Sequence, residues 1–311
     1  MAKVFITGIT GFLGSNIATY LVEQGHTLAA TYRDGSSKHL CKDFEDRIIW
    51  ILQDGNSWLK KAIDFEPEIV IHSAWIGVGH LERNVWEIQS ANIVFTEQVL
   101  SVAQKAMAKK FISLGSQAEY GVFDGCITEE HALSPTEAYG CVKLVCAELV
   151  KQFCNHNKID WFWLRLFSFF GKGESEKWLI PTLVNKLLTT DQMDLTPGEQ
   201  KYAYLYVEDL GRAINQIINI NGTSGAYNIS GKNLVSLRSL VEFIRDQINP
   251  LFLLNFSKLS YRENQPMHMQ GNVSKFVNEF GEFEISDFKE SLILTINHIK
   301  ELVKNINNES I

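Results

Sequence analysis

The sequence predicts an α/β protein in which a parallel sheet is doubly wound, with helices on both faces. Strand-like and helix-like segments alternate through the first half of the chain, an order that indicates parallel strands joined by helical crossovers. The first strand-like run is followed at once by a glycine-rich stretch, Thr7-Gly-Ile-Thr-Gly-Phe-Leu-Gly14, and then by a helical pattern. Strand, glycine-rich turn and helix in this order are typical of dinucleotide binding.

Short apolar runs mark the expected strands, which are residues 4–7, 27–32, 48–52, 69–72, 110–114 and 161–167, with a further strand at 226–230. Amphipathic patterns mark the expected helices, which are residues 15–22, 85–109, 138–156, 178–188, 207–220, 237–248 and 289–306. From this order we expect a Rossmann domain built from residues 1–169 and 208–231. Residues 170–207 and 232–311 are expected to form a smaller substrate-binding α/β region.

The three glycines of the turn have different expected roles. Gly8 allows the tight turn, Gly11 lets the backbone approach a pyrophosphate, and Gly14 lets helix and strand pack closely. The helix that follows offers unpaired N–H groups and the positive end of its dipole to phosphates. The expected cofactor contacts of this turn are Gly8, Thr10, Gly11, Phe12, Leu13 and Gly14. The alternative is a glycine-rich turn that binds no ligand.

Tyr139 and Lys143 form a second motif, in the run Glu137-Ala-Tyr-Gly-Cys-Val-Lys143. Four residues apart on a helix, the two side chains share one face. A free tyrosine has a pKa of about 10, and a nearby ammonium lowers that pKa because it favours the phenolate. Such a pair can move a proton to or from a hydroxyl or ketone. The same spacing is common on protein surfaces. The pair therefore indicates a catalytic site only in combination with the glycine-rich turn.

Composition excludes several classes of function. The net charge is −7 and no basic block occurs, so we expect no nucleic-acid or membrane partner. Five cysteines without metal-like spacing predict a reduced protein with no disulfide scaffold and no metal site. Residues 1–5 lead directly into a strand and no apolar run could span a bilayer, which predicts a cytoplasmic location.

With these motifs, the chain resembles the extended short-chain dehydrogenase/reductase family, which contains nucleotide-sugar epimerases, dehydratases and ketoreductases. The resemblance runs nearly end to end. The matching parts are residues 7–14, Asp54, 71–74, Asn92, 113–121, the Tyr139/Lys143 pair, 164–171, 206–209 and 225–229. The resemblance implies an NAD(P)-dependent oxidoreductase.

The resemblance also implies roles for single residues. Ser116 would orient the substrate oxygen, Tyr139 would exchange the proton, and Lys143 would bind the nicotinamide ribose and lower the tyrosine pKa. Ser113 is the competing serine, but it lies inside a strand-like run. Further cofactor contacts implied by the family are Asp54, Gly55, Ser73, Ala74, Asn92 and Phe167. For Asp54 the alternative is a solvated loop carboxylate.

The end of the second strand indicates which cofactor is used. NAD-binding members of the family usually place an acid there, but here the strand ends in Tyr32-Arg33, and Asp34 comes only later. An arginine can bind a 2′-phosphate through charge-assisted, bidentate hydrogen bonds. Ser36, Ser37 and Lys38 could add donors, so we expect NADP(H) in preference to NAD(H). The alternative is that Arg33 is simply an exposed loop residue.

Departures from the family pattern argue against two of the reactions that the family carries out. The 4,6-dehydratases carry an Asp-Glu pair directly after the catalytic Ser or Thr, and this chain has Gln117-Ala118, which cannot act as acid or base. The epimerase-reductases that make GDP-fucose use a Cys and a His, and here the matching positions are Gln117 or Ala118 and Trp178. What remains is hydride chemistry, in a single-step 4-ketoreductase or a 4-epimerase.

The substrate contacts implied by the resemblance are Trp75, Gln117, Ser168, Lys177, Trp178, Tyr202 and Arg262. Arg262 matches an arginine that clamps the diphosphate. Ser168 and Tyr202 replace an Asn and an Arg of many relatives, and Lys201 could supply the missing charge. For Trp75 the alternative is a core tryptophan.

We therefore expect NADPH-dependent reduction of the C4 ketone of a nucleoside-diphosphate 4-keto-6-deoxyhexose, a step of deoxysugar biosynthesis such as that of lipopolysaccharide O-antigen. The alternatives are an NAD-dependent nucleotide-sugar 4-epimerase and a non-catalytic NAD(P)-binding sensor. In many relatives the two long helices form the four-helix bundle of a homodimer. Here these helices are residues 85–109 and 138–156, whose apolar stripes could also be core.

Overall fold

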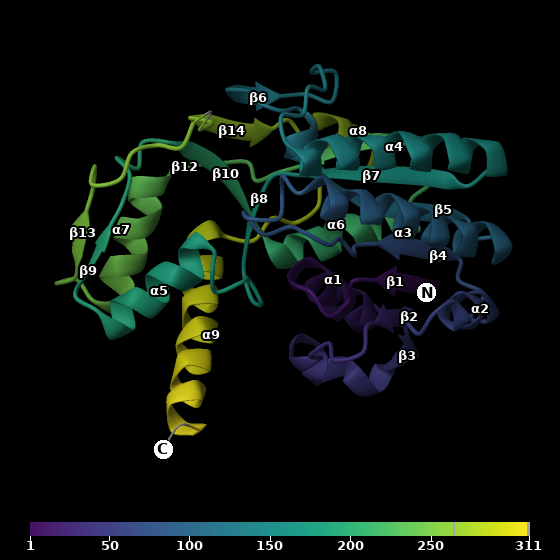
Figure 1. Cartoon of the computed structure of the whole chain (residues 1–311), viewed down its shortest axis with the longest axis horizontal. Helices are drawn as coiled ribbons and strands as arrows, with labels where there is room; N and C mark the ends of the chain where they lie inside the picture. Colours follow the sequence, from purple (N-terminus) through teal and green to yellow (C-terminus); the bar gives the residue numbers. More distant parts are fainter. Residues whose placement is uncertain (264, 310–311) are drawn as a thin grey trace.

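The computed structural model describes residues 1–263 and 265–309 and confirms the doubly wound α/β fold (Figure 1). Its main sheet has seven strands in the order β11-β7-β5-β4-β1-β2-β3, and every neighbouring pair is parallel. The strands are β1 (Lys3–Thr7), β2 (Thr27–Tyr32), β3 (Ile48–Leu52), β4 (Ile69–His72), β5 (Lys110–Ser116), β7 (Asp160–Leu166) and β11 (Gly225–Ile229). All seven lie within two residues of the expected strands.

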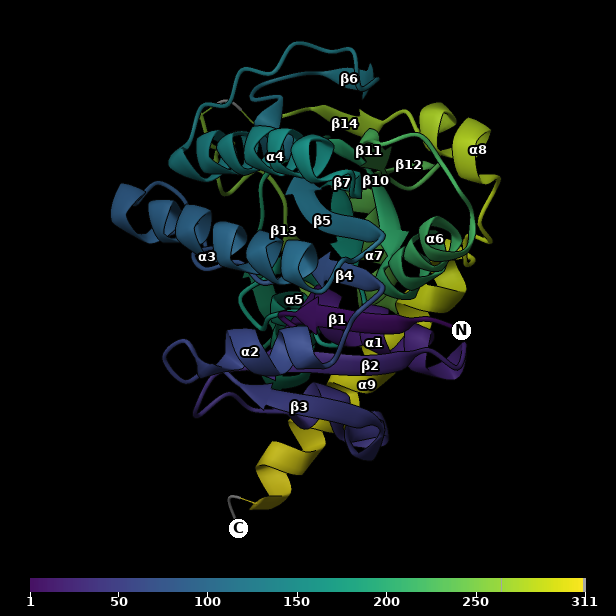
Figure 2. The same cartoon turned by 90° about the vertical axis from the view of Figure 1, so that its right-hand side faces the viewer.

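Helices cover both faces of this sheet, because each face consists of apolar side chains that need a partner layer. The helices of this domain are α1 (Phe12–Glu23), α2 (Ser57–Asp64), α3 (Trp86–Lys105), α4 (Ala138–Asn157), α6 (Val207–Asn219) and α8 (Ser274–Phe280), with 3-10 turns η1 (His39–Arg47) and η2 (Gln117–Glu119). One core joins the sheet to α2, α3 and α4, and another joins it to α1, α6 and α8. Figure 2 shows α3 and α4 on one side and α6 and α8 on the other.

The second region is smaller and has its own core between helices and a mixed sheet. Its sheet has the order β12-β10-β14-β6, with β8 also pairing with β10, and β9 and β13 form a separate pair. The strands are β6 (Gly125–Ile127), β8 (Ser168–Phe170), β9 (Gln192–Asp194), β10 (Lys201–Tyr206), β12 (Leu234–Ser236), β13 (Leu253–Asn255) and β14 (His268–Gly271). The helices are α5 (Leu179–Thr189), α7 (Leu237–Ile248) and α9 (Phe288–Glu309). Within the described residues no helix is both long and apolar enough to cross a bilayer.

Two segments pack across the expected division of the chain. β6, from the first expected segment, pairs with β14 in the second sheet. α8, from the last expected segment, returns to the main sheet because Phe276 and Phe280 pack on Tyr227 of β11, with ring centroids 6.2 and 5.3 Å from that of Tyr227. The division into two domains remains a prediction, since the chain passes between the regions several times.

The strand order of the main sheet reverses between β1 and β4. β1 and β4 lie side by side at this point, and ligands of such sheets bind outside the carboxyl ends of the strands. Gly8 has a φ of +78°, and a Cβ there would lie 2.6 Å from the Ala74 nitrogen. A Cβ on Gly14 would lie 2.1 Å from the Gly8 oxygen, so helix α1 can approach the end of β1 this closely only without a side chain at position 14.

Candidate active site

Ser116 is the last residue of β5, at the carboxyl end of the strand. Its Oγ accepts a hydrogen bond from the Ala118 N–H at 3.2 Å, and its own N–H donates to the Glu119 carboxylate at 2.8 Å. These two bonds form a capping box that fixes the start of η2. Ser113 is 1% exposed and lies inside the strand, whereas Ser116 ends it, so Ser116 remains the predicted catalytic serine.

Tyr139 lies in the first turn of α4, and its hydroxyl is within hydrogen-bonding reach of Ser116. The helix has no side-chain cap of its own. Instead the Tyr139 N–H donates to the Arg83 carbonyl at 2.8 Å, and the Ala138 N–H donates to Asn84 Oδ1 at 3.1 Å. The loop between β4 and α3 therefore caps the helix that carries the tyrosine.

Lys143 lies one turn further along α4 and is only 4% exposed. Its Nζ donates to the Leu114 carbonyl at 2.6 Å and lies 3.5 Å from the centroid of the Trp75 ring. Burial lowers the pKa of Lys143 to about 7. An ammonium has three donors, so two N–H bonds remain for a ligand.

Burial sets the direction of the Tyr139 pKa shift. Burial raises the pKa of Tyr139, because the 8% exposed phenol loses the water that would stabilise a phenolate. The cation that opposes this rise is Arg83, while the Lys143 ammonium lies 5.8 Å from the ring centroid. The expected lowering of the tyrosine pKa by Lys143 stays a prediction.

A buried charge network lies behind the serine. Glu119 is fully buried and accepts hydrogen bonds from Arg165 Nε and Trp163 Nε1, both at 2.8 Å, in addition to the Ser116 N–H. Arg165 also donates to the Tyr120 hydroxyl at 3.1 Å. Sequence reasoning missed the roles of Glu119 and Arg165, although the Ser-x-x-Glu capping pattern was a signal for the first.

The glycine-rich turn fits a dinucleotide. Helix α1 begins at Phe12 with Gly11 as N-cap and no side-chain cap, so its first N–H groups are available to phosphate oxygens. A Cβ on Gly11 would meet only the Gly8 oxygen, at 3.4 Å, which leaves this side of the turn open. Thr10 and Leu13 belong to the same turn, and at the end of β4 the Ala74 N–H donates to Thr7 Oγ1 at 3.3 Å.

The loop after β2 carries two cations. Lys38 contacts neighbouring side chains, and Arg33 is exposed. Lys38 Nζ lies 4.4 and 4.1 Å from the ring centroids of Tyr32 and Trp50 and pairs with Glu45 at 3.4 Å. Arg33 is exposed and makes no ion pair with another described residue. Of the two cations predicted to contact the cofactor, Arg33 is therefore the one free to do so.

The Asn92 amide bonds to the loop after β4. Its Oδ1 accepts from the Ile76 N–H at 2.8 Å, and its Nδ2 donates to the carbonyls of Ile76 and Gln89 at 3.1 and 3.0 Å. The amide thus holds this loop, and its expected contact with the cofactor stays a prediction.

Other predicted cofactor residues follow strands of the main sheet. Asp54 and Gly55 follow β3, and the Asp54 carboxylate accepts from the Ser57 hydroxyl, a bond that lowers its pKa. Ser73 directly follows β4 and precedes Ala74. Phe167 follows β7, and its ring centroid lies 6.3 Å from that of Tyr120.

The predicted substrate residues fall into three groups. Trp75 packs beside Tyr139 and Lys143, with its ring centroid 6.0 Å from that of Tyr139, and Gln117 opens η2 next to Ser116. Tyr202 and Arg262 lie close together, since Arg262 opposes the rise that burial causes in the pKa of Tyr202. The rest are Ser168 on β8 and the exposed Lys177 and Trp178 at the start of α5. No described contact joins these groups to one another.

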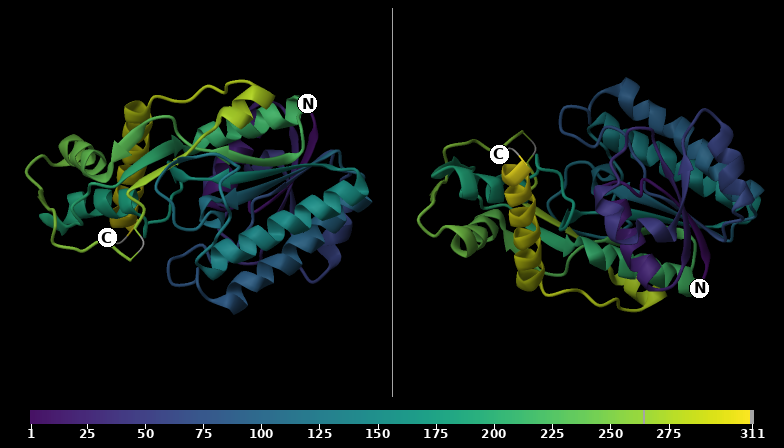
Figure 3. Two further views of the ribbon diagram at one scale, coloured as in Figure 1. Left: turned by 90° about the horizontal axis from the view of Figure 1, so that it is seen from above. Right: turned by 90° about the horizontal axis from the view of Figure 1, so that it is seen from below.

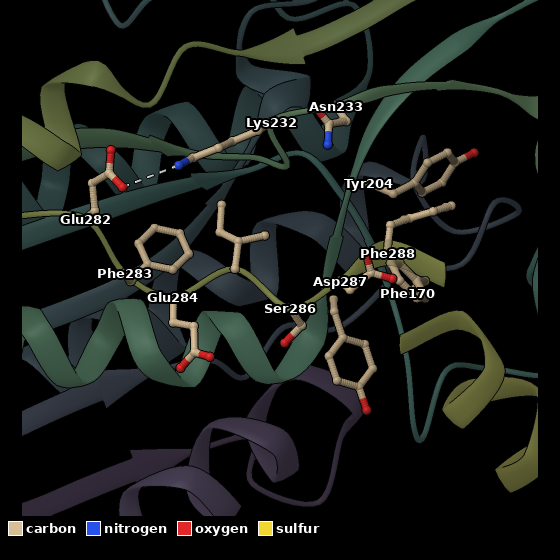
Figure 4. Close-up of a pocket in the computed structure, with 12 residues that line it drawn as sticks. Phe170, Tyr204, Lys232, Asn233, Glu282, Phe283, Glu284, Ser286, Asp287 and Phe288 are labelled. Atoms are coloured by element: carbon tan, nitrogen blue, oxygen red, sulfur yellow. Dashed lines mark ion pairs between the residues drawn. The ribbon is translucent and has the colours of Figure 1, made fainter. Parts of the chain in front are cut away.

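A cavity of about 400 Å³ lies elsewhere, between the second sheet and the segment that joins α8 to α9. Figure 4 shows aromatic side chains such as Tyr204 and Phe288 around it, and a Lys232–Glu282 ion pair of 3.7 Å on one side. None of Ser116, Tyr139 and Lys143 lines this cavity. It is therefore separate from the candidate active site.

Comparison with known proteins agrees with this geometry. Residues 4–230 match the model of the NAD dependent epimerase/dehydratase family. The chain is 22% identical to CDP-abequose synthase of Salmonella muenchen over 284 residues, which cover 90% of this chain and 92% of the relative. It is also 22% identical to dTDP-4-dehydro-6-deoxyglucose reductase of Escherichia coli over 285 residues, covering 86% and 87% of the two chains.

Among solved structures, UDP-glucuronic acid 4-epimerase of Bacillus cereus, in complex with UDP-glucuronic acid and NAD, has a TM-score of 0.83. The match is 19% identical and covers 96% of this chain and 99% of the other. Relatives named as a 4,6-dehydratase and as 4-epimerases also match the chain at 23–24% identity. The comparisons thus establish family and fold, and the reaction has to be argued from the site.

Proposed function

The chain belongs to the NAD-dependent epimerase/dehydratase family, and on that premise we propose that it reduces the C4 ketone of a nucleoside-diphosphate 4-keto-6-deoxyhexose with NADPH. The observation that carries this proposal is the meeting of Ser116, Tyr139 and Lys143 beside the dinucleotide turn. Relatives named as a reductase and as an abequose synthase support a substrate of this class.

Each side chain has a distinct task in the proposed reaction. The bound dinucleotide would supply the hydride that forms the new C4–H bond. Tyr139 would give its phenolic proton to the C4 oxygen, and Ser116 would hold that oxygen through its hydroxyl. Lys143 would hold the cofactor ribose with the N–H groups not used by the Leu114 carbonyl. Trp75 and the loop after β4 would keep water from the phenol.

Two features favour reduction over the other reactions of the family. Dehydration needs an acid and a base beside the ketone, and the carboxylate that bonds the Ser116 N–H, Glu119, is buried and bonded to three donors. An epimerase recycles a tightly bound NAD+ within one turnover, whereas a reductase exchanges its cofactor and draws on NADPH, so the exposed Arg33, which could hold a 2′-phosphate, favours reduction.

For the cofactor we propose a preference for NADPH that depends on Arg33. Replacing Arg33 with Ala should weaken NADPH binding about ten- to a hundred-fold, since a hydrogen bond to a charged group contributes about 1.5–3 kcal/mol. Binding of NADH should change little. Dissociation constants measured by quenching of tryptophan fluorescence would check this, with the exposed Arg47→Ala as a matched control. Equal losses for both cofactors would contradict the assignment.

The reaction itself can be tested by NADPH consumption with dTDP-, CDP-, GDP- and UDP-linked 4-keto-6-deoxyhexoses, with NADH in parallel. We expect rapid oxidation of NADPH with one of them. No oxidation with any of them, together with NAD+ released when the purified protein is denatured, would replace the reductase by a 4-epimerase. A protein that binds NADPH and turns over no substrate of either kind would be the non-catalytic sensor.

For the assembly we propose a homodimer through α3 and α4. The two helices pack side by side (Figure 3), and each leaves an apolar side chain on its outer surface, Val94 at 57% and Val145 at 50% exposure. A second copy would cover this surface. Sedimentation velocity should give twice the chain mass for the native protein and a shift to monomer for Val145→Glu. A native monomer at micromolar concentration would contradict the dimer.

A further inference from the structure

Arg83 covers one face of the catalytic tyrosine. Its guanidinium carbon lies 4.1 Å from the centroid of the Tyr139 ring, and its Nε donates to the Glu137 carboxylate at 2.9 Å. The same residue accepts the Tyr139 N–H through its backbone carbonyl. Arg83 comes from the loop between β4 and α3, so one residue of a distant loop contacts both the backbone and the ring of Tyr139.

The loop holds Arg83 in this place. The Arg83 N–H donates to the Gly79 carbonyl at 3.1 Å, and the Val85 N–H donates to the Glu82 carbonyl at 3.1 Å. From α3, the fully buried Gln89 donates through Nε2 to the carbonyls of Gly77 and Glu82, at 2.7 and 3.1 Å. The guanidinium is therefore positioned by a network and does not simply rest against the nearest ring.

The Arg83 cation opposes the effect of two nearby carboxylates on the pKa of Tyr139. Glu119 and Glu137 both raise the tyrosine pKa, the first from η2 and the second from the start of α4. Lys143, also on α4, has its ammonium 5.8 Å from the ring centroid and directed to Leu114, and Ser116 of β5 is neutral. Among the described residues, Arg83 has the cation closest to the ring, and its side chain is only 23% exposed. Partial burial reduces screening by water, so the charge acts more strongly on the ring.

We propose that Arg83 is a positioning residue of the active site, and that its guanidinium, anchored by Glu137, sets how readily Tyr139 releases its proton. A cation over the ring stabilises phenolate more than phenol, so Arg83 favours proton release. The consequence of Arg83 for turnover rests on the proposed function. The effect of Arg83 on proton release by Tyr139 holds whichever reaction the site carries out.

A direct test is to titrate Tyr139 in the full-length protein labelled with 3-fluorotyrosine, whose phenol is more acidic than that of tyrosine. Fluorine NMR would follow the resonance, which the Tyr139→Phe variant identifies by its loss. In Arg83→Met the pKa of residue 139 should rise by about half a unit to one unit, as expected for loss of a partly shielded cation–π contact. Arg83→Lys should restore part of the shift. An unchanged or lowered pKa in Arg83→Met would overturn the proposal.

The controls separate charge from structure. Every Arg83 variant keeps the backbone carbonyl that caps α4, and Arg83→Gln serves in the same way as Arg83→Met should the latter not fold. Arg245→Met, which removes an arginine paired with Asp246 on α7, should leave the Tyr139 titration unchanged. A shift as large in Arg245→Met as in Arg83→Met would also overturn the proposal.

If the protein is a ketoreductase, kcat should fall as pH rises through the pKa of its proton donor. Arg83→Met should move that fall to higher pH by the amount seen in the NMR titration. A purely structural residue would lower kcat at every pH without moving the fall. Because the titration needs no substrate, a failure of the proposed reaction would leave the test of Arg83 intact.

Discussion

Replacing Tyr139 with phenylalanine should reduce turnover at least about a hundred-fold while leaving the dissociation constant for NADPH nearly unchanged. A positioned proton donor contributes about 10²–10⁴ to the rate. Phenylalanine keeps the ring that packs against Trp75 and Arg83 and loses only the hydroxyl near Ser116. The helix start is also kept, because the Arg83 carbonyl binds the backbone of residue 139.

The measurement is kcat with the substrate identified by NADPH consumption, together with a fluorescence titration of NADPH. Tyr20→Phe is a matched control, because this tyrosine lies on α1 and its ring packs near Gly211, away from Ser116. Full activity of Tyr139→Phe would remove this residue as the proton donor. An equal loss of NADPH binding would instead show that the variant disturbs the cofactor site.

The fold could be predicted, and candidate catalytic residues could be named, because their signals are local. Gly8 and Gly14 each occupy a place where a Cβ would collide with backbone, so the fold requires glycine there and the sequence displays it directly. Tyr139 and Lys143 are linked by helix periodicity alone. Ser116 ends a strand whose apolar run is visible in the sequence.

Other parts depend on contacts between distant segments, which no local pattern encodes. Arg83 lies in an irregular loop, and only the tertiary fold places its guanidinium over a ring 56 residues away. The same holds for Lys38, named as a further donor for the phosphate, whose ammonium lies 4.4 and 4.1 Å from the ring centroids of Tyr32 and Trp50. The sign of the Tyr139 pKa shift also depends on burial, which Tyr-x-x-x-Lys spacing cannot report.

The buried pair Glu119–Arg165 should dominate the stability of the active-site edge. Arg165→Met should lower the free energy of unfolding by about 3–5 kcal/mol, because it leaves a carboxylate with no cation in a site closed to water. The Arg165 side chain is 7% exposed and that of Glu119 is fully buried, so water cannot replace the lost partner. Urea denaturation would measure the change.

A double-mutant cycle would attribute this loss to the unpaired charge. Glu119→Gln keeps an acceptor for the Ser116 and Trp163 N–H groups and removes the charge, so adding it to Arg165→Met should recover part of the stability. Lys60→Met, which breaks a pair exposed at 80% and 58%, should change stability by less than about 1 kcal/mol. If Arg165→Met lowers the free energy of unfolding no more than Lys60→Met does, the buried pair does not stabilise this edge of the site. A large cost without recovery in the double variant would instead attribute the loss to the packing of the Arg165 side chain.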